Sequence, residues 1–252
     1  MIMNNKIKLP TLILLLVVGI SFGQNLPKFV YVQGGTFTMG DEWNSGNTDE
    51  LPIHEVTIKS FSISQTEITV AQYRYYCNAT GTAMPEEPEW GWQSNHPIVN
   101  VSWYDAINYA NWLSEKINHN VRLPYESEWE YAARGANKTK GLKFSGSNKM
   151  ENAGWFSGNS GFKIHDVATN APNELGLYDM SGNVWEWCMD IYDEDYYDYG
   201  PKNNPMGATK GERRVVRGGS FNDGAAYSRI ANRRWDSPNS IVYSSGIRLV
   251  SF

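Results

Sequence analysis

Short segments in which hydrophobic and polar residues alternate lie toward both ends of the chain. This period-two pattern predicts β-strands at residues 29–32, 36–39, 54–58 and 61–64, and further strands at 215–221 and 246–250. Gln33-Gly34-Gly35 joins the first two segments, and Lys59-Ser60 joins the next two. Because glycine and small polar residues suit tight turns, each pair is typical of a β-hairpin.

Helical spacing replaces this alternation in the middle of the chain. Thr69 is suited to cap a helix that ends at Gly81. Ser102 and Asp105 form a capping box at the start of a longer helix, and a third short helix is predicted at residues 125–134. The connections between these elements are long and polar. We therefore predict one irregular α+β domain, with a bound ion holding its loops together.

A turn followed by a strand carries the most unusual chemistry in the sequence, at residues 176–188. Asp179 and Glu186 supply carboxylate oxygens, and Gly182 permits a sharp backbone turn between them. Carbonyl groups exposed by such a turn would complete an oxygen cage for Ca²⁺. The alternative is that the carboxylates only solvate the turn, while the neighbouring tryptophans fill the core on the opposite face of the strand.

Composition and charge argue against two classes of partner. The formal net charge is -5 and the sequence pI is about 5.4, with no basic cluster, so we expect binding neither to nucleic acid nor to an anionic membrane surface. The chain contains 10 tryptophans, 15 tyrosines and 23 glycines, which predicts a loop-rich protein packed largely by aromatic side chains.

Residues 1–23 are typical of a cleaved signal peptide. Two lysines precede an apolar run, which ends in the small residues Ser21 and Gly23. The mature chain would then begin near Gln24, fold as a single domain over residues 24–252, and lie in the periplasm or outside the cell. A membrane anchor retained in the mature protein is the alternative reading of the same run.

Several ordered motifs resemble one protein family. They are Gly34-Gly35-Thr36-Phe37-Thr38-Met39-Gly40, Glu67-Ile68-Thr69, His96-Pro97-Ile98-Val99-Asn100-Val101-Ser102-Trp103, the run at residues 122–135, Gly176-Leu177-Tyr178-Asp179-Met180-Ser181-Gly182-Asn183-Val184-Trp185-Glu186-Trp187, Arg217-Gly218-Gly219-Ser220 and Gly246-Ile247-Arg248-Leu249. Together they are similar to the formylglycine-generating enzyme, or sulfatase-modifying factor, family. The resemblance implies a complex variant of the C-type-lectin-like fold with little regular secondary structure.

The same resemblance assigns candidate calcium ligands. It implies a site held by the side chains of Asp179 and Glu186 and by backbone oxygens of Gly182 and Val184. A second calcium site of the family is shortened here, at residues 159–162. We therefore predict one calcium ion.

Copper is not expected in this chain. Formylglycine-generating members of the family hold Cu(I) between two thiolates and use O₂ to oxidise a substrate cysteine. The matching tail positions hold Asp223 and Ser228, and neither supplies the soft thiolate that Cu(I) requires. Ser220 matches an active-site serine of the family, but a serine after two glycines is also a common turn residue. Whether the chain is an enzyme therefore stays open.

The two cysteines and a run of glutamates need separate interpretation. Export favours a disulfide between Cys77 and Cys188. In the family that the chain resembles, the cysteine at this position pairs with a cysteine in the tail. That tail position holds Ser228 here, which favours a buried free thiol at Cys188.

The alternate glutamates at 126, 128 and 130 lie on the third predicted helix, where we expect them not to converge on one point.

Two classes of function follow from these observations. The first is a secreted, calcium-stabilised module that binds a protein or glycan partner or serves in assembly, and the missing thiols favour it. The second is an enzyme, either a formylglycine-generating oxidase that converts a sulfatase cysteine or another tailoring member of the family. We favour the binding module because the sequence offers no convergent acid, base or nucleophile.

Overall fold

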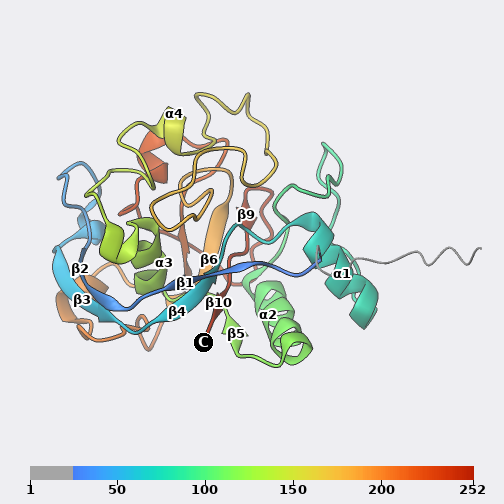
Figure 1. Ribbon diagram of the computed structural model, residues 1–252, viewed down its shortest axis with the longest axis horizontal. Coiled ribbons are helices and arrows are strands. Elements are labelled where there is room, and N and C mark those ends of the chain that lie inside the picture. The colour runs from blue at the N-terminus through green and yellow to red at the C-terminus, as the bar shows by residue number, and fades with distance from the viewer. Residues whose placement is uncertain (1–24) are drawn as a thin grey trace, which may run out of the picture.

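The structure is a computed structural model that describes residues 25–252 (Figure 1). The predicted signal peptide, residues 1–23, lies outside the described residues. Short strands and helices are joined by long loops over the described part, which confirms the predicted α+β class. No helix between residues 25 and 252 is long and apolar enough to cross a membrane.

The first four strands form one long, interrupted hairpin and not the two hairpins predicted. Its antiparallel pairs are β1 (Phe29–Val32) with β4 (Phe61–Ser64), and β2 (Gly35–Met39) with β3 (His54–Ile58). Gly34 explains the error, because a Cβ atom there would lie 2.5 Å from the carbonyl oxygen of Ile58. The glycine allows two backbones to approach closely, and the turn of the hairpin lies further on, at residues 40–53.

Strands from the end of the chain complete two four-stranded sheets. The first has the order β1-β4-β10-β5, with β5 at Val121–Arg122 and β10 at Val250–Ser251. The second has the order β8-β7-β6-β9, built from β6 (Trp185–Ile191), β7 (Arg214–Arg217), β8 (Arg234–Asp236) and β9 (Ser245–Gly246). β6 continues from the predicted turn, and its Trp185 and Trp187 are buried in the core.

The three predicted helices are present, and the first two begin where their caps indicate. They are α1 (Val70–Thr80), α2 (Trp103–Ile117) and α3 (Glu126–Ala133). Thr69 accepts a hydrogen bond from the Gln72 amide at the start of α1, and Gly81 adopts a left-handed conformation, with φ of 76°, at its end. α1 and α2 contact each other on the side of the molecule away from β2 and β3 (Figure 1).

Short helical turns interrupt the long polar connections. They are η2 (Thr48–Glu50), η3 (Ala136–Lys138), α4 (Met150–Ala153), α5 (Tyr196–Tyr199) and η4 (Ala225–Ser228). α1, α2 and the tryptophans of β6 share one hydrophobic cluster, while α3 packs in another with the first four strands. The candidate turn at residues 176–184 enters β6 and therefore lies between these two parts of the core.

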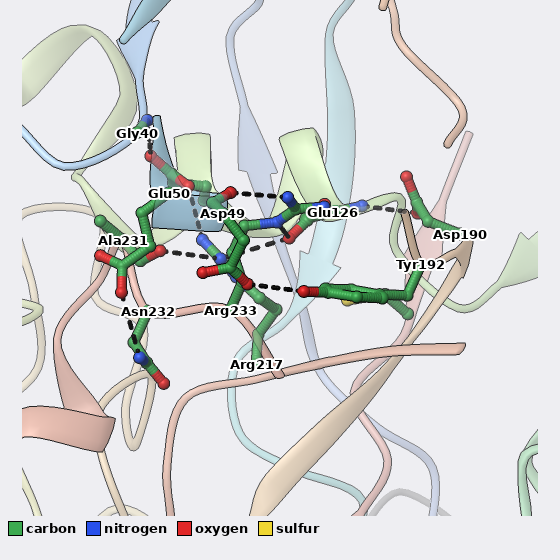
Figure 2. A network of polar contacts seen from close by, with 12 residues as sticks. Gly40, Asp49, Glu50, Glu126, Asp190, Tyr192, Arg217, Ala231, Asn232 and Arg233 are labelled. Carbon is green, nitrogen blue, oxygen red and sulfur yellow. Dashed lines mark hydrogen bonds and ion pairs between the residues drawn. The ribbon is translucent and has the colours of Figure 1, made fainter. Parts of the chain in front are cut away.

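Buried ion pairs connect earlier segments of the chain with its C-terminal quarter (Figure 2). Arg217 of β7 is fully buried and contacts Glu130 at 2.5 Å and Glu126 at 3.3 Å. Arg233 donates to both oxygens of Glu126, at 2.8 and 3.0 Å. Arg229 binds Glu50 through two hydrogen bonds of 2.6 and 2.7 Å. Charges this deep in the protein are tolerated because each has a partner of opposite sign.

The predicted divergence of the α3 glutamates is therefore wrong for two of the three. Glu126 and Glu130 lie four residues apart on one face of the helix, so both reach Arg217. Glu128 points away and pairs with Arg122 at 2.7 Å. The converging pair is held by arginines, and it serves the packing of α3 against β7.

Candidate functional site

A cluster of buried charges surrounds the first residues of β6. Glu186 is fully buried, and its two carboxylate oxygens accept hydrogen bonds of 2.9 and 2.8 Å from the Nε atom of Arg248. Trp129 donates its indole N–H to Glu186 Oε2 at 2.6 Å. One predicted calcium ligand is thus already held by a guanidinium group and an indole.

Asp179, the other predicted carboxylate ligand, keeps one oxygen free. The residue is 2% exposed and adopts a left-handed backbone conformation, with φ of 57°. Its Oδ2 atom accepts a hydrogen bond of 2.7 Å from the Ala168 amide. Its Oδ1 atom is buried and has no hydrogen-bond partner within residues 25–252. A buried carboxylate oxygen without a partner is costly unless a cation or a proton compensates it.

Glu67 is a third carboxylate in this cluster, and the sequence analysis did not assign it a role. It is fully buried at the end of the loop before α1. Its oxygens accept hydrogen bonds from the Val184 amide at 3.3 Å and from the Asn183 side chain at 3.2 Å. The sequence signal for a buried role of Glu67 is its place in the motif Glu67-Ile68-Thr69, next to an apolar residue and before the helix cap.

Electrostatics in the cluster leave an excess of negative charge. Burial, followed by the nearby charges of Asp179 and Glu186, raises the pKa of Glu67 well above its usual range. Burial also raises the pKa of Asp179 to about 6, against an opposing hydrogen bond from the Ala168 amide. Arg248 supplies one positive charge against three carboxyl groups. Two protons or one divalent cation would neutralise the two negative charges that remain when all three carboxyl groups are ionised.

The residues of the predicted calcium site fit a cation in part. Asp179 has a free oxygen, and the carbonyl oxygens of Gly182 and Val184 accept no hydrogen bond from residues 25–252. Glu186 fits less well, because Arg248 and Trp129 already occupy its oxygens. In the described part of the chain, no three His, Cys, Asp or Glu side chains are grouped to hold a metal ion. A calcium ion here would depend on backbone carbonyls, as oxygen-rich calcium sites often do.

Asp223 and Ser228, the two tail residues singled out in the sequence, lie close to Ser220 and Gly219. Ser220 is fully buried, and its hydroxyl contacts Asp223 Oδ2 and, at 2.5 Å, Asn222 Oδ1. Trp185 donates its indole N–H to Asp223 Oδ2 at 2.8 Å. Ser228 is fully buried, with a hydroxyl that has no partner within the described residues. The structure therefore joins Ser220 to Asp223 by a hydrogen bond and leaves the Ser228 hydroxyl buried nearby, beside Gly219.

This tail segment lines two hollows. Asn222 lines a hollow of about 990 Å³, and Asp223 lines another of about 530 Å³. Four of the large hydrophobic side chains exposed on the described protein line these hollows: Phe162, Tyr227, Trp235 and Tyr243. Exposed aromatic residues gathered around a concave surface are typical of a binding face.

The two cysteines do not form a disulfide. Cys77 in α1 and Cys188 in β6 are both buried free thiols. Burial raises the pKa of both thiols, and this suppresses the thiolate form that binds metals and attacks disulfides. The free-thiol alternative for Cys188 is thus the one found.

Comparison with known proteins places these features in a family context. A sequence model of the family described as "Sulfatase-modifying factor enzyme 1-like domain" matches residues 20–251. A formylglycine-generating enzyme from Streptomyces coelicolor is 30% identical over 282 aligned residues, covering 87% of this chain and 87% of that protein. The solved structure of PvdO from Pseudomonas aeruginosa gives a TM-score of 0.80 at 28% identity, over 90% of this chain and 95% of that one.

One similar protein is much longer than this chain. The serine/threonine-protein kinase pkn1 from Chlamydia pneumoniae is 31% identical over 249 aligned residues, which cover 88% of this chain. They cover 38% of that kinase, so the likeness spans well under half of its length. These matches include both the carboxylate cluster and the tail segment within the region shared with the family.

Proposed function

Because the chain belongs to the family of sulfatase-modifying factor enzyme 1-like domains, we propose that it is an exported binding or assembly module, stabilised by calcium and without copper-dependent formylglycine-generating activity. The fold is the formylglycine-generating-enzyme type, a complex variant of the C-type-lectin-like fold. A shared fold hosts several functions, so the proposal rests on the chemistry of the site.

The observation that carries the proposal is the chemistry of the tail. Asp223 and Ser228 stand where copper-binding thiolates would be needed, and Cu(I) prefers soft sulfur ligands. Asp223 is engaged by Trp185 and Ser220, and Ser228 is fully buried. The two remaining thiols, at positions 77 and 188, are buried on other elements. No pair of thiols in the described chain is therefore available to hold copper at Ser220.

The binding role is supported by the two hollows and their exposed aromatic residues. Aromatic side chains at a concave surface contribute large contact areas to protein and glycan ligands. The leader-like residues 1–23 support export, and we propose a partner in the periplasm or outside the cell. Calcium would be held by Asp179 together with the carbonyl oxygens of Gly182 and Val184, with Glu186 and Glu67 adding negative charge. Its chemical contribution is to fix the turn that leads into β6.

Metal analysis of the purified mature protein is the first test. After chelation and reloading, we expect about one calcium per chain and no copper retained from a Cu(I) solution. Envelope and secreted extracts, and a glycan array, are then probed with the calcium-loaded protein. Stoichiometric Cu(I) binding, or the absence of any protein or glycan partner in both screens, would contradict the proposal.

An oxidase remains a second candidate because one observation favours it. Ser220 is retained beside the indole of Trp185 and matches an active-site position of the family. If the chain is a formylglycine-generating enzyme, or another tailoring oxidase, a sulfatase peptide with its cysteine should be converted in the presence of Cu(I) and O₂. The double variant Asp223→Cys with Ser228→Cys is the matched control, because it restores two thiols without altering Ser220. We expect no conversion by the native chain. We also expect none by the double cysteine variant when copper is withheld.

A further inference from the structure

The larger hollow is lined by distant parts of the chain. They are the loop at residues 86–90, Asn100, residues 162–163, the segment after Ser220, and Tyr243. Asn100 donates its side-chain amide to the Glu86 carbonyl at 2.9 Å and so holds the loop in place. The hollow measures about 990 Å³, which is the size of a small-molecule pocket.

Three aromatic rings pack together at this hollow, and two of them, Trp90 and Tyr243, are exposed to it in part. The ring centroids of Trp90 and Phe221 are 5.9 Å apart, those of Phe221 and Tyr243 are 6.1 Å apart, and those of Trp90 and Tyr243 are 6.2 Å apart. Phe221 is buried and anchors the group, whereas Tyr243 is 49% exposed. Because the electron-rich faces of aromatic rings attract cations, such a surface suits a positively charged ligand with an apolar part.

The charged residues of the hollow point to the same class of ligand. Glu86, Glu87 and Glu89 line it, against the single positive charge of Lys163. Glu87 accepts a hydrogen bond of 3.0 Å from the Trp92 amide. The carboxylates of Glu86 and Glu89 are exposed and take part in no ion pair or hydrogen bond with residues 25–252. The hollow thus combines an excess of negative charge with an aromatic surface.

We propose that this hollow binds an organic cation, with an ammonium or guanidinium group beside the glutamates and the apolar part of the ligand on the aromatic rings. Neither half of the arrangement suffices alone: carboxylates on open surface bind cations weakly, and aromatic rings without charge do not select for them. The inference rests on the proposed binding role, because the hollow belongs to the same face. The cationic group of the ligand belongs either to a free molecule, such as a polyamine, or to a basic side chain of a polypeptide.

Fluorescence anisotropy with two labelled pentapeptides tests the proposal on the calcium-treated mature protein. One peptide carries arginine at its centre, and the other carries citrulline, which has nearly the same shape without the charge. We expect the arginine peptide to bind at least about fivefold more tightly, because charge and cation–π contacts each contribute. Spermidine as a competitor distinguishes the two sources: displacement assigns the site to free cations as well, and no displacement assigns it to a polypeptide-borne cation.

Matched variants separate the hollow from the general charge of the protein. The double variant Glu86→Gln with Glu89→Gln should weaken the arginine peptide by about fivefold to tenfold and leave the citrulline peptide unchanged. Glu115→Gln with Glu151→Gln removes the same charge from exposed positions elsewhere and should have no effect. Tyr243→Leu removes a ring while keeping an apolar side chain, and should weaken the arginine peptide more than the citrulline peptide, because only the charged side chain makes a cation–π contact.

Equal binding of both peptides, no binding of any cation, or the same loss in both double variants would overturn the inference. A chain that binds no cation and yet captures a glycan or envelope protein would overturn this inference alone. Copper-dependent oxidation of a cysteine peptide would overturn the proposed function, whatever the peptides do.

Discussion

Calcium and pH should act together on stability through Asp179. Its carboxyl is 2% exposed, and burial raises its pKa to about 6 from an ordinary value near 3.8. Without calcium, the folded state therefore holds a proton more tightly than the unfolded state between these two values. Folding stability should fall as pH rises through this window, and the loss from Asp179 alone amounts to about 3 kcal/mol above it.

Glu67 adds to this loss in the same direction. Its pKa is also raised, first by burial and then by the charges of Asp179 and Glu186. A bound calcium ion would reverse the balance, because it keeps the carboxylates ionised and its affinity increases as they lose protons. At a concentration 100 times its dissociation constant, a ligand stabilises the folded state by about 2.7 kcal/mol. For a domain of this size we expect calcium to raise the melting temperature by roughly 5 to 11 °C at about pH 7.5.

Thermal unfolding followed by circular dichroism measures both effects, in chelator and in calcium, at about pH 5 and about pH 7.5. The calcium effect should be largest at the higher pH. Asp179→Asn should unfold at a higher temperature than the native chain in chelator at about pH 7.5, and should respond less to calcium. Asp198→Asn, at an exposed position, is the control and should behave like the native chain. If calcium leaves the melting temperature of the native chain unchanged at the higher pH, the reasoning about this cluster is refuted.

Three further predictions concern the fold. Arg217→Met should lower the free energy of unfolding, measured in urea, by about 3 to 5 kcal/mol. Arg122→Met is the control, because its ion pair is partly exposed, and should lower it by about 1 kcal/mol. Similar losses in both variants would contradict the role of the buried network. Gly34→Ala should lower the free energy of unfolding, measured in urea, by at least about 2 kcal/mol, and a neutral effect would mean that the backbones can separate there. Cys77 and Cys188 should both react with a thiol reagent in denaturant without a reductant and stay unreactive when folded, and fewer than two reactive thiols would indicate a disulfide.

Local signals in the sequence were sufficient to predict the helices and the strand of the candidate site. Thr69 and Ser102 offer side-chain oxygens to the free amides of a first helical turn, and this requirement does not depend on distant residues. Alternation after Gly182 likewise predicts β6, because the side chains of a strand point to opposite faces. Such features are fixed within a few residues of one another.

Pairing between distant segments could not be predicted in this way. Gly34 has the same sequence signature whether it forms a turn or a close crossing, and the crossing depends on a partner strand that comes 24 residues later at Ile58. The same holds for Glu67, whose partners Asn183 and Val184 lie 116 and 117 residues further along the chain. Glu126 and Glu130 were expected to diverge because the arginine they share lies on β7, far away in sequence.

The tail segment shows how the fold keeps its shape with no thiolate at either position. Asp223 accepts hydrogen bonds from the Trp185 indole and the Ser220 hydroxyl. Gly219 is in a left-handed conformation, with φ of 77°, and a Cβ atom there would lie 2.4 Å from the Ser228 hydroxyl oxygen. These contacts hold the segment against β6 by side-chain hydrogen bonds and close packing. A ligand in either hollow would therefore meet, at Asn222 or Asp223, a segment that these contacts already hold in place.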